Sequence, residues 1–360
     1  MIWSLDRMED LAAQPESQAF PLERVHTFDR IGPEAWGWSL GMRVAVSFRD
    51  LPTDCIIHQH GIWTGVSAVA RSWRMKRHGA SVIAAHGSLS RWALRRSRWK
   101  KALALTAYER CNLRNASCLH ALSQTEASQF RDFGLTNPVA VVPNGISQEW
   151  LTSRGDAQRF RQAFAVASEC RILLFLSRIT PIKGLPILIE GIRANAKAFD
   201  GWILLIAGVD EFDHRPELEA LVNRYQLSDS VRFIGPLYGD TKRDAFAAAD
   251  AFVLPSHSEG WPIVVLEALG AAVPVFTTTA TPFPELTEHR AGWIVDPSVD
   301  SMVASLPELL SRSPEELRNM GSRGRALVAD RYTWDSASVQ LAAVYTWLLG
   351  HGPRPCCVSM

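Results

Sequence analysis

The chain contains 360 residues, of which 47% are hydrophobic and 21% are charged, and its formal net charge is +1. This length suits two domains rather than one core, and the composition excludes disordered and fibrous classes. A net charge this close to zero gives no overall attraction for nucleic acid. The six cysteines show no C-x-x-C and no zinc-type spacing, so we expect reduced thiols rather than disulfides or a zinc site.

The N-terminus has no basic region followed by an apolar stretch, so it does not resemble a signal peptide. No apolar run approaches the roughly 18–20 residues that a membrane-spanning helix requires. We therefore expect a cytoplasmic protein, either free or lying peripherally on the inner face of the cytoplasmic membrane.

Short apolar segments alternate with longer amphipathic segments along the chain, a pattern typical of parallel sheets covered by helices. In the first half, strands are expected at 55–58, 81–85, 118–122 and 139–142. The helices expected between them are 65–77, 97–114 and 124–133.

The second half repeats this alternation more clearly, after a turn at Pro143, Asn144 and Gly145. Strands are expected at 172–176, 202–207, 231–234, 251–254 and 273–277. The expected helices are 185–196, 216–225, 240–248 and 262–270. We therefore predict a first domain at 1–165, a second at 166–333, a closing helix at 334–349 that packs back toward the first domain, and a disordered tail at 350–360.

Two acidic residues follow the strand expected at 251–254. Pro262 suits the first turn of a helix, which places free backbone N–H groups at the carboxyl edge of a parallel sheet, where phosphates bind. Glu259 lies in the turn, and Glu267 lies about 7 Å along the helix axis. Carboxylates do not suit phosphate, but they accept hydrogen bonds from sugar and ribose hydroxyls. The alternative is an ordinary turn and helix with one capping and one solvent-facing Glu.

With Gly260 after the first acidic residue, Glu259-x7-Glu267 resembles the Glu-x7-Glu motif of family 4 (group 1) retaining glycosyltransferases. The segment 175–185, which contains Arg178 and Lys183, is similar to that family's basic diphosphate-binding segment. Further similar segments occur in the family's order at 143–146, 207–208, 231–235, 272–275 and 284–293. The resemblance implies the GT-B fold, an α/β architecture of two Rossmann-like domains facing a cleft.

The resemblance also implies roles for the matching residues. Arg178 and Lys183 would neutralise the donor diphosphate and stabilise the leaving nucleoside diphosphate, whose negative charge grows as the glycosidic bond breaks. The alternative for both cations is simple solvation at the surface. Glu259 would hold hydroxyls of the donor sugar, and Glu267 would hold those of the ribose. The remaining donor-binding residues would be Gly260, Trp261, Pro262 and Ile263 at the phosphates or sugar, and Phe233 and Ile234 at the nucleobase.

No two aspartates lie two residues apart, so the Asp-x-Asp metal motif of the other major glycosyltransferase fold is missing. The acidic cluster of Asp210, Glu211 and Asp213 has a different spacing and is interpreted as a solvated loop. We therefore expect neither a metal nor a cofactor, with a nucleotide-diphosphate sugar as the donor substrate.

Two histidines of the first half lie at expected strand ends. His86 follows the strand at 81–85, and the alternative to a functional role is a structural histidine in a turn. The resemblance places the family's histidine near the transferred sugar and the acceptor hydroxyl, so His86 is a catalytic candidate, and His60 would line the acceptor side. We assign neither as a general base. Retention without a protein nucleophile points to front-face attack, in which the departing phosphate takes the acceptor proton.

A basic segment runs from Arg91 to Lys101 and includes Trp92 and Trp99. Cations interleaved with tryptophans suit an anionic membrane surface. A solvated basic helix is the alternative, and nucleic acid is not expected because no binding module accompanies the charge. The resemblance favours the membrane, since such enzymes often extend lipid-linked sugars there, and this segment is similar to bacterial exopolysaccharide and lipopolysaccharide transferases.

The opening of the chain departs from the family. Members begin with a strand, a Gly-rich turn and a helix, whereas Trp3 to Asp6 is similar to the end of the second strand and an irregular segment follows to about Pro33. We therefore expect an N-terminally truncated first domain with an incomplete sheet and exposed apolar edges.

The sequence predicts a metal-independent, retaining hexosyltransferase that moves a sugar from a nucleotide-diphosphate sugar to a saccharide or lipid-linked acceptor in bacterial cell-surface polysaccharide synthesis. Two alternatives stay open. One is a truncated, inactive homologue that still binds a nucleotide sugar, and the other is an epimerase or phosphorylase of the same fold. Labelled nucleotide sugar, incubated with and without acceptor, separates transfer from isomerisation.

Overall fold

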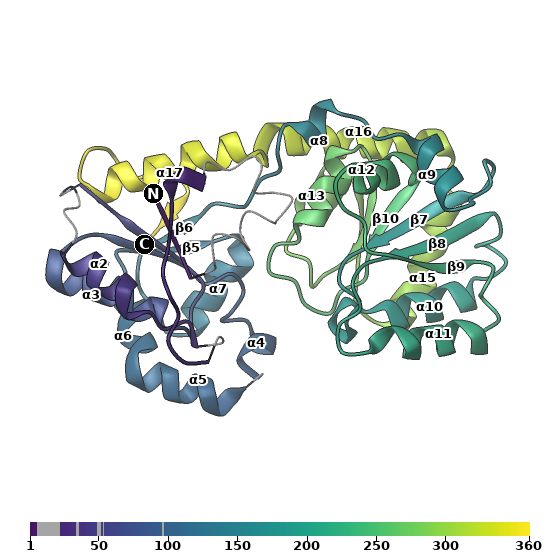
Figure 1. Cartoon of the computed structure of the whole chain (residues 1–360). Coiled ribbons are helices and arrows are strands. Elements are labelled where there is room, and N and C mark those ends of the chain that lie inside the picture. Colours follow the sequence, from purple (N-terminus) through teal and green to yellow (C-terminus); the bar gives the residue numbers. More distant parts are fainter. Residues whose placement is uncertain (6–21, 34–35, 49–51, 53, 96) are drawn as a thin grey trace. The chain divides into compact units, whose positions relative to one another are not determined.

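The computed structural model describes residues 1–5, 22–33, 36–48, 52, 54–95 and 97–360. It divides into a first unit, Met1–Pro143 with Ser338–Met360, and a second unit, Asn144–Ala337 (Figure 1). The division differs from the expected one at residues 144–165, which group with the second unit. There α9 (Ala157–Ala163) packs against α12 (Gly239–Ala248), and Arg159 pairs with Asp244 at 2.6 Å.

The second unit is built on six parallel strands in the order β12-β11-β10-β7-β8-β9. The strand order reverses between β7 and β10, and in open α/β sheets such a switch point forms a ligand-binding crevice. Strand residues such as Leu173, Leu204 and Val253 are fully buried, because helices cover both faces. The strands are β7 (Arg171–Leu176), β8 (Trp202–Ala207), β9 (Val231–Gly235), β10 (Ala251–Leu254), β11 (Val275–Thr278) and β12 (Gly292–Val295).

Helices lie on both faces of this sheet (Figure 1). One face carries α10 (Leu185–Ala194), α11 (His214–Arg224) and α15 (Val299–Leu310). The other carries α8 (Glu149–Thr152), α9, α12, α13 (Ile263–Gly270) and α16 (Pro314–Arg331). Short α14 (Glu285–Glu288) precedes β12. Gly191 lets α10 and α15 approach closely, since a Cβ there would lie 2.9 Å from atoms of Met302 and Leu306.

The first unit contains a five-stranded sheet in the order β13-β6-β5-β4-β3. The strands are β3 (Ile57–His60), β4 (Ser81–Ala84), β5 (Cys118–Ala121), β6 (Val139–Val141) and β13 (Val358–Ser359). The first four are parallel, and β13 adds antiparallel to β6. The prediction of a disordered tail at 350–360 is therefore wrong. Pairing with β13 satisfies backbone groups that the edge of β6 would otherwise expose, and Val358 becomes buried.

The helices of the first unit include α2 (Leu40–Phe48), α3 (Val66–Arg77) and α7 (Gln124–Asp132). The helix expected at 97–114 is divided into α5 (Arg98–Ala104), a π-helical turn η4 (Leu105–Glu109) and α6 (Arg110–Arg114). α17 (Trp334–Leu348) starts in the second unit, and its residues from Ser338 onward group with the first, as expected for the closing helix.

The opening residues form a separate small sheet. β1 (Ile2–Ser4) pairs in parallel with β2 (Val25–Thr27), which follows a 3-10 turn, η2 (Leu22–Arg24). Much of the segment expected to be irregular lies outside the described residues. In the described part of the chain, β3 is the last strand of the five-stranded sheet. Across the same described ranges, no helix combines the length and apolar character needed to cross a membrane.

Candidate active site

Lys183 and Glu259 meet at the switch point of the second-unit sheet. Lys183 ends a 3-10 turn, η5 (Pro181–Lys183), that follows β7, and Glu259 lies in the loop after β10. The Lys183 Nζ atom lies 2.7 Å from Glu259 Oε1, and the side chains are only 11% and 9% exposed. The Ser256 hydroxyl donates to the same oxygen at 2.5 Å. The structure thus brings a cation and a carboxylate together, nearly buried, at the switch point, which is where such sheets bind ligands.

Backbone contacts fix the loops that carry this pair. Gly184 has φ +69°, and a Cβ there would lie 2.0 Å from the Pro255 carbonyl oxygen, so only glycine fits. The His257 N–H donates to the Ile182 carbonyl at 2.8 Å. On the other side, the Glu259 N–H donates to the Ala280 carbonyl at 3.2 Å. The loops after β7, β10 and β11 therefore hold one another in place.

Glu267 has a lysine of its own. It lies on α13 and is 8% exposed, and the Nζ atom of Lys242 on α12 lies 2.7 Å from its carboxylate. Lys242 also lies 5.5 Å from the ring centre of Trp150. Our sequence interpretation missed Lys242. Its position in the sequence could have indicated it, because Lys242 lies in the first turn of the helix after β9. That helix starts at the carboxyl edge of the parallel sheet, as α13 does.

Arg178 takes a different partner from the one the sequence interpretation implied. Its Nη1 atom lies 3.0 Å from both carboxylate oxygens of Glu211, and its side chain is 64% exposed. The loop containing Asp210 and Glu211 was interpreted as merely solvated. Instead, Glu211 pairs with Arg178, and Asp210 accepts hydrogen bonds from the N–H groups of His214 and Arg215. Arg178 therefore lies at the solvent side of the loop after β7.

Some of the other donor-binding candidates lie in the loop before α13, and others have side chains that pack against neighbouring residues. Gly260 is exposed and Pro262 is the N-cap of α13, whose first residue, Ile263, is 38% exposed. The Trp261 side chain serves packing: its Nε1–H donates to the Asn144 carbonyl at 3.0 Å, and its ring contacts Phe283 and Tyr332. Phe233 and Ile234 are half-buried on β9.

His60 and His86, both in the first unit, contact each other. His60 ends β3, and His86 follows β4 with φ +50°. The Nδ1 atom of His60 lies 2.9 Å from Nε2 of His86. The buried Glu126 carboxylate fixes this loop by accepting from the N–H groups of Gly87 at 2.6 Å and Leu122 at 2.8 Å. Glu126 is a further residue that the sequence interpretation missed.

Two more histidines, His58 on β3 and His120 on β5, lie beside this pair and were also missed. Burial, with the nearby charges of His60, His120 and His86, lowers the pKa of His58 to about 2. Loss of water around the ring, with His86 and His120, lowers the pKa of His60 to about 4. Burial also lowers the pKa of His86 and of His120. The cluster is therefore uncharged at neutral pH.

Family models match both parts of the chain. The model described as glycosyl transferases group 1 matches residues 156–327, and the model described as a glycosyl transferase 4-like domain matches residues 7–145. The first match contains Arg178, Lys183, Glu259 and Glu267, and the second contains His60 and His86. Both groups of candidates thus fall within glycosyltransferase domains.

Curated relatives are also glycosyltransferases. The chain is 29% identical over 253 residues to an uncharacterized glycosyltransferase of Methanocaldococcus jannaschii, covering 67% of this chain and 61% of that one. It is 31% identical over 214 residues to the GDP-mannose-dependent alpha-(1-6)-phosphatidylinositol monomannoside mannosyltransferase of Mycobacterium tuberculosis, covering 54% and 55%. The match thus spans less than two thirds of the length of these relatives.

Solved structures share the fold. The Anabaena protein HepE, crystallised with UDP and glucose, matches with a TM-score of 0.72 and 20% identity, over 93% of this chain and 90% of that one. The two family models and this likeness agree with the parallel sheets of the two units. The chain therefore belongs to the group 1 glycosyltransferases and has the α/β GT-B fold.

Proposed function

We propose that this protein transfers a hexose from a nucleotide-diphosphate sugar to a saccharide or lipid-linked acceptor, with retention and without a metal. The observation that carries the proposal is the Lys183–Glu259 pair at the switch point between β7 and β10. A bound diphosphate needs cations, whereas the sugar and ribose beside it need hydrogen-bond acceptors. The Lys183–Glu259 and Lys242–Glu267 pairs offer both kinds of group.

Binding would proceed by an exchange of partners. Lys183 would turn its ammonium group from Glu259 to a phosphate oxygen, while Ser256 keeps its 2.5 Å hydrogen bond to the carboxylate. In the described part of the chain Glu259 Oε2 has no partner, so this oxygen can accept from a sugar hydroxyl. Glu267 would accept from the ribose. Arg178, on the exposed side of the loop, would supply a second cation.

The chemical step would follow from this placement. The bond between the anomeric carbon and the diphosphate breaks, and negative charge gathers on the leaving oxygen. Lys183 stabilises that charge more strongly in a nearly buried site than it would in water. The acceptor hydroxyl attacks the same face of the sugar, and its proton passes to the departing phosphate. His60 and His86 would lie on the acceptor side.

Glu259→Gln tests the sugar contact. The substitution removes a carboxylate acceptor but keeps the side-chain shape, so we expect transfer to fall by about 100-fold. Affinity for UDP or GDP by calorimetry should stay equal or rise, because Lys183 loses its competing partner. The donor is chosen by a thermal-shift screen of UDP- and GDP-sugars. Glu315→Gln, at an exposed position on α16, is the matched control.

Unchanged transfer by the Glu259→Gln variant would exclude the proposed sugar contact. A wild-type protein that binds UDP or GDP but transfers no sugar would instead favour the inactive homologue. The two results are separable, because nucleotide affinity is measured on the same samples.

We further propose that α4 (Arg91–Arg95) and α5 bind an anionic membrane surface in the cytoplasm. Trp92, Trp99 and Leu103 are 48%, 67% and 62% exposed, and the sequence 91–104 contains no acidic residue. Such apolar side chains among cations suit the lipid headgroup region. Lys101 is an exception, since its Nζ atom donates to the Ala93 carbonyl and lies 5.8 Å from the Trp63 ring centre.

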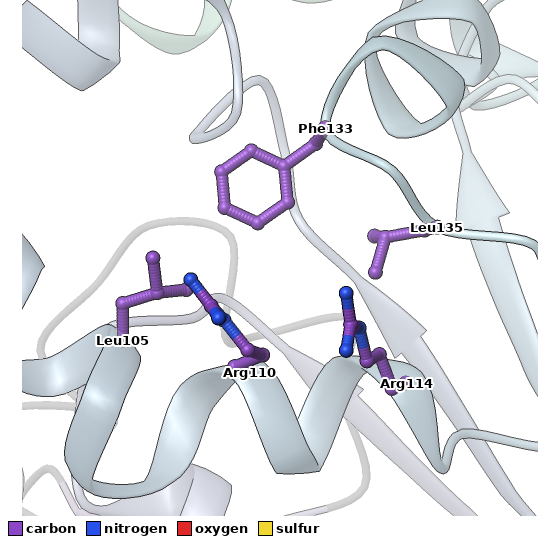
Figure 2. A pocket seen from close by; sticks show the side chains of 5 residues that line it. All are labelled: Leu105, Arg110, Arg114, Phe133 and Leu135. Atoms are coloured by element: carbon purple, nitrogen blue, oxygen red, sulfur yellow. The ribbon is translucent and has the colours of Figure 1, made fainter.

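A cavity of about 220 Å³ lies along the continuation of α5 into η4 and α6. The guanidinium groups of Arg110 and Arg114 stand on one side, and Phe133 and Leu135 lie across from them (Figure 2). These two cations extend the positive charge of α4 and α5, which supports an anionic partner for the surface.

Trp99→Ser should reduce binding to phosphatidylglycerol vesicles about tenfold in a sedimentation assay, because an exposed indole contributes on the order of 1–2 kcal/mol at an interface. Binding should also fall with added salt. Trp334→Ser, which removes a tryptophan that is 48% exposed in the second unit, is the control. Equal vesicle binding by the wild type and the Trp99→Ser variant would contradict the membrane proposal.

A further inference from the structure

Four histidines lie on one face of the first-unit sheet around Ala84. In the strand register, His60 is opposite Ala84, and Ala84 is opposite His120. His58 precedes His60 by two residues and so points to the same face. His86 follows Ala84 by two residues. Because Ala84 carries only a methyl group and is fully buried, it leaves room for the imidazole rings on either side.

Hydrogen-bond partners determine which nitrogens of the inner pair carry hydrogens. Nε2 of His120 lies 2.7 Å from the Val142 carbonyl, which only accepts, so this nitrogen is protonated. In an uncharged His120, Nδ1 then accepts, and the Nε2–H of His58 donates to it at 3.2 Å. Nδ1 of His58 therefore accepts from the Tyr345 hydroxyl at 2.6 Å. A single arrangement of hydrogens satisfies all three contacts.

This inner chain supports the outer pair. The ring of His58 stacks on that of His60 with centroids 4.3 Å apart and an interplanar angle of 28°. His60 in turn holds His86 through the Nδ1–Nε2 contact of 2.9 Å. The outer nitrogens, Nδ1 of His86 and Nε2 of His60, have no hydrogen-bond partner in the described ranges of the chain.

We propose that His60 is a positioning residue, which holds Nε2 of His86 so that Nδ1 of His86 is the atom that meets a bound sugar or acceptor. The role of His86 itself rests on the proposed function. A single hydrogen occupies the contact between the two rings. When His60 donates it, His86 Nδ1 carries a hydrogen; when His60 accepts it, His86 Nδ1 is bare. The tautomers of the two rings therefore change together.

The surroundings favour an uncharged pair. Burial disfavours a cation on His60 most strongly, and His86 and His120 disfavour it further. Burial lowers the pKa of His86 and outweighs Glu126, the carboxylate that raises it among the described residues and whose two oxygens already accept from Gly87 and Leu122. From α17, the Tyr345 hydroxyl contacts this cluster and donates to His58. A neutral His86 can accept a hydrogen bond from a sugar hydroxyl, whereas an imidazolium can only donate.

The test is nuclear magnetic resonance of the full chain with ¹⁵N-labelled histidine, assigned with the His86→Gln variant. In the wild type we expect a scalar coupling across the hydrogen bond between His60 Nδ1 and His86 Nε2. The His60→Phe variant keeps a ring but loses the partner. There the coupling should vanish, and the pKa of His86 should fall further, because a protonated His86 loses the ring nitrogen that can accept from its Nε2–H. The His60→Asn variant offers a polar atom near the Nδ1 position and should restore the wild-type pKa of His86.

Absence of the coupling in the wild type would overturn the proposal. So would a His86 that titrates identically in the wild type and the His60→Phe variant. If the His60→Phe variant does not fold, the coupling in the wild type decides alone. None of these measurements needs a donor or an acceptor, so failure of sugar transfer would count against the proposed function and leave the positioning role of His60 intact.

Discussion

Replacing Lys183 by Met should weaken UDP or GDP binding by roughly 30- to 100-fold, because a hydrogen bond to a charged group contributes about 2–3 kcal/mol. Methionine keeps most of the side-chain volume while removing the ammonium group. The loss should appear in calorimetric titration of each nucleotide. Lys197→Met, at an exposed position in the same unit, is the matched control and should bind like the wild type.

The Lys183→Met variant should also lower the melting temperature of the second unit. It leaves the carboxylate of Glu259, 9% exposed, without its ion-pair partner, and an unpaired charge in such a position is costly. The double variant Lys183→Met/Glu259→Gln should recover stability without recovering nucleotide binding. If the double variant regains binding as well, the effect of Lys183 is structural and its assignment to the diphosphate is wrong.

Mild acid should destabilise the first unit. The pKa of His58 is about 2 in the folded protein against an ordinary value of 6.5, so below about pH 6.5 the unfolded chain binds more protons than the folded chain. The free energy of unfolding is therefore highest above pH 6.5 and falls as the pH decreases. Between pH 7 and pH 5, the low pKa of His58 alone decreases the free energy of unfolding by about 2 kcal/mol. The lowered pKa of His120 acts in the same direction.

Calorimetric unfolding at pH 7 and pH 5 measures this loss. The His58→Gln variant should show a smaller difference between the two pH values, although it is less stable at pH 7 because Tyr345 and His120 lose a partner. His78→Gln, at an exposed position after α3, is the control. An equal pH dependence in the wild type and the His58→Gln variant would show that this cluster does not govern acid stability.

The sequence predicted the bounds of two strands that are buried on both faces. The ranges 202–207 and 251–254 match β8 and β10 at both ends, because their apolar runs are continuous. β3 was placed two residues too early, at 55–58 instead of Ile57–His60. The strand ends in His58, Gln59 and His60, whose polarity argues against a buried strand. His58 has partners on β5 and α17, Gln59 has partners on α3 and α6, and His60 contacts His86. Such distant partners are invisible in a local pattern.

The candidate site likewise depends on contacts between residues that are distant in the sequence. The motif predicted that Glu259 and Glu267 share a segment, and the structure adds that each is paired with a lysine. The Lys183–Glu259 contact joins residues 76 positions apart, and it could be expected because both follow strands that meet at the switch point. For Lys242 the signal was weaker, since it was only a place in the first turn of the helix after β9, and a lysine on a helix usually faces solvent.

The pairing of charges around the switch point of the second-unit sheet has a consequence for how ligands arrive. Lys183, Lys242 and Arg178 are each matched by one carboxylate, from Glu259, Glu267 and Glu211. At rest these three cations are therefore neutralised by their partners, and they exert little long-range attraction on a dianion approaching through solution. Encounter with the nucleotide should depend weakly on ionic strength, and selectivity for it arises only after contact, when the cations change partners.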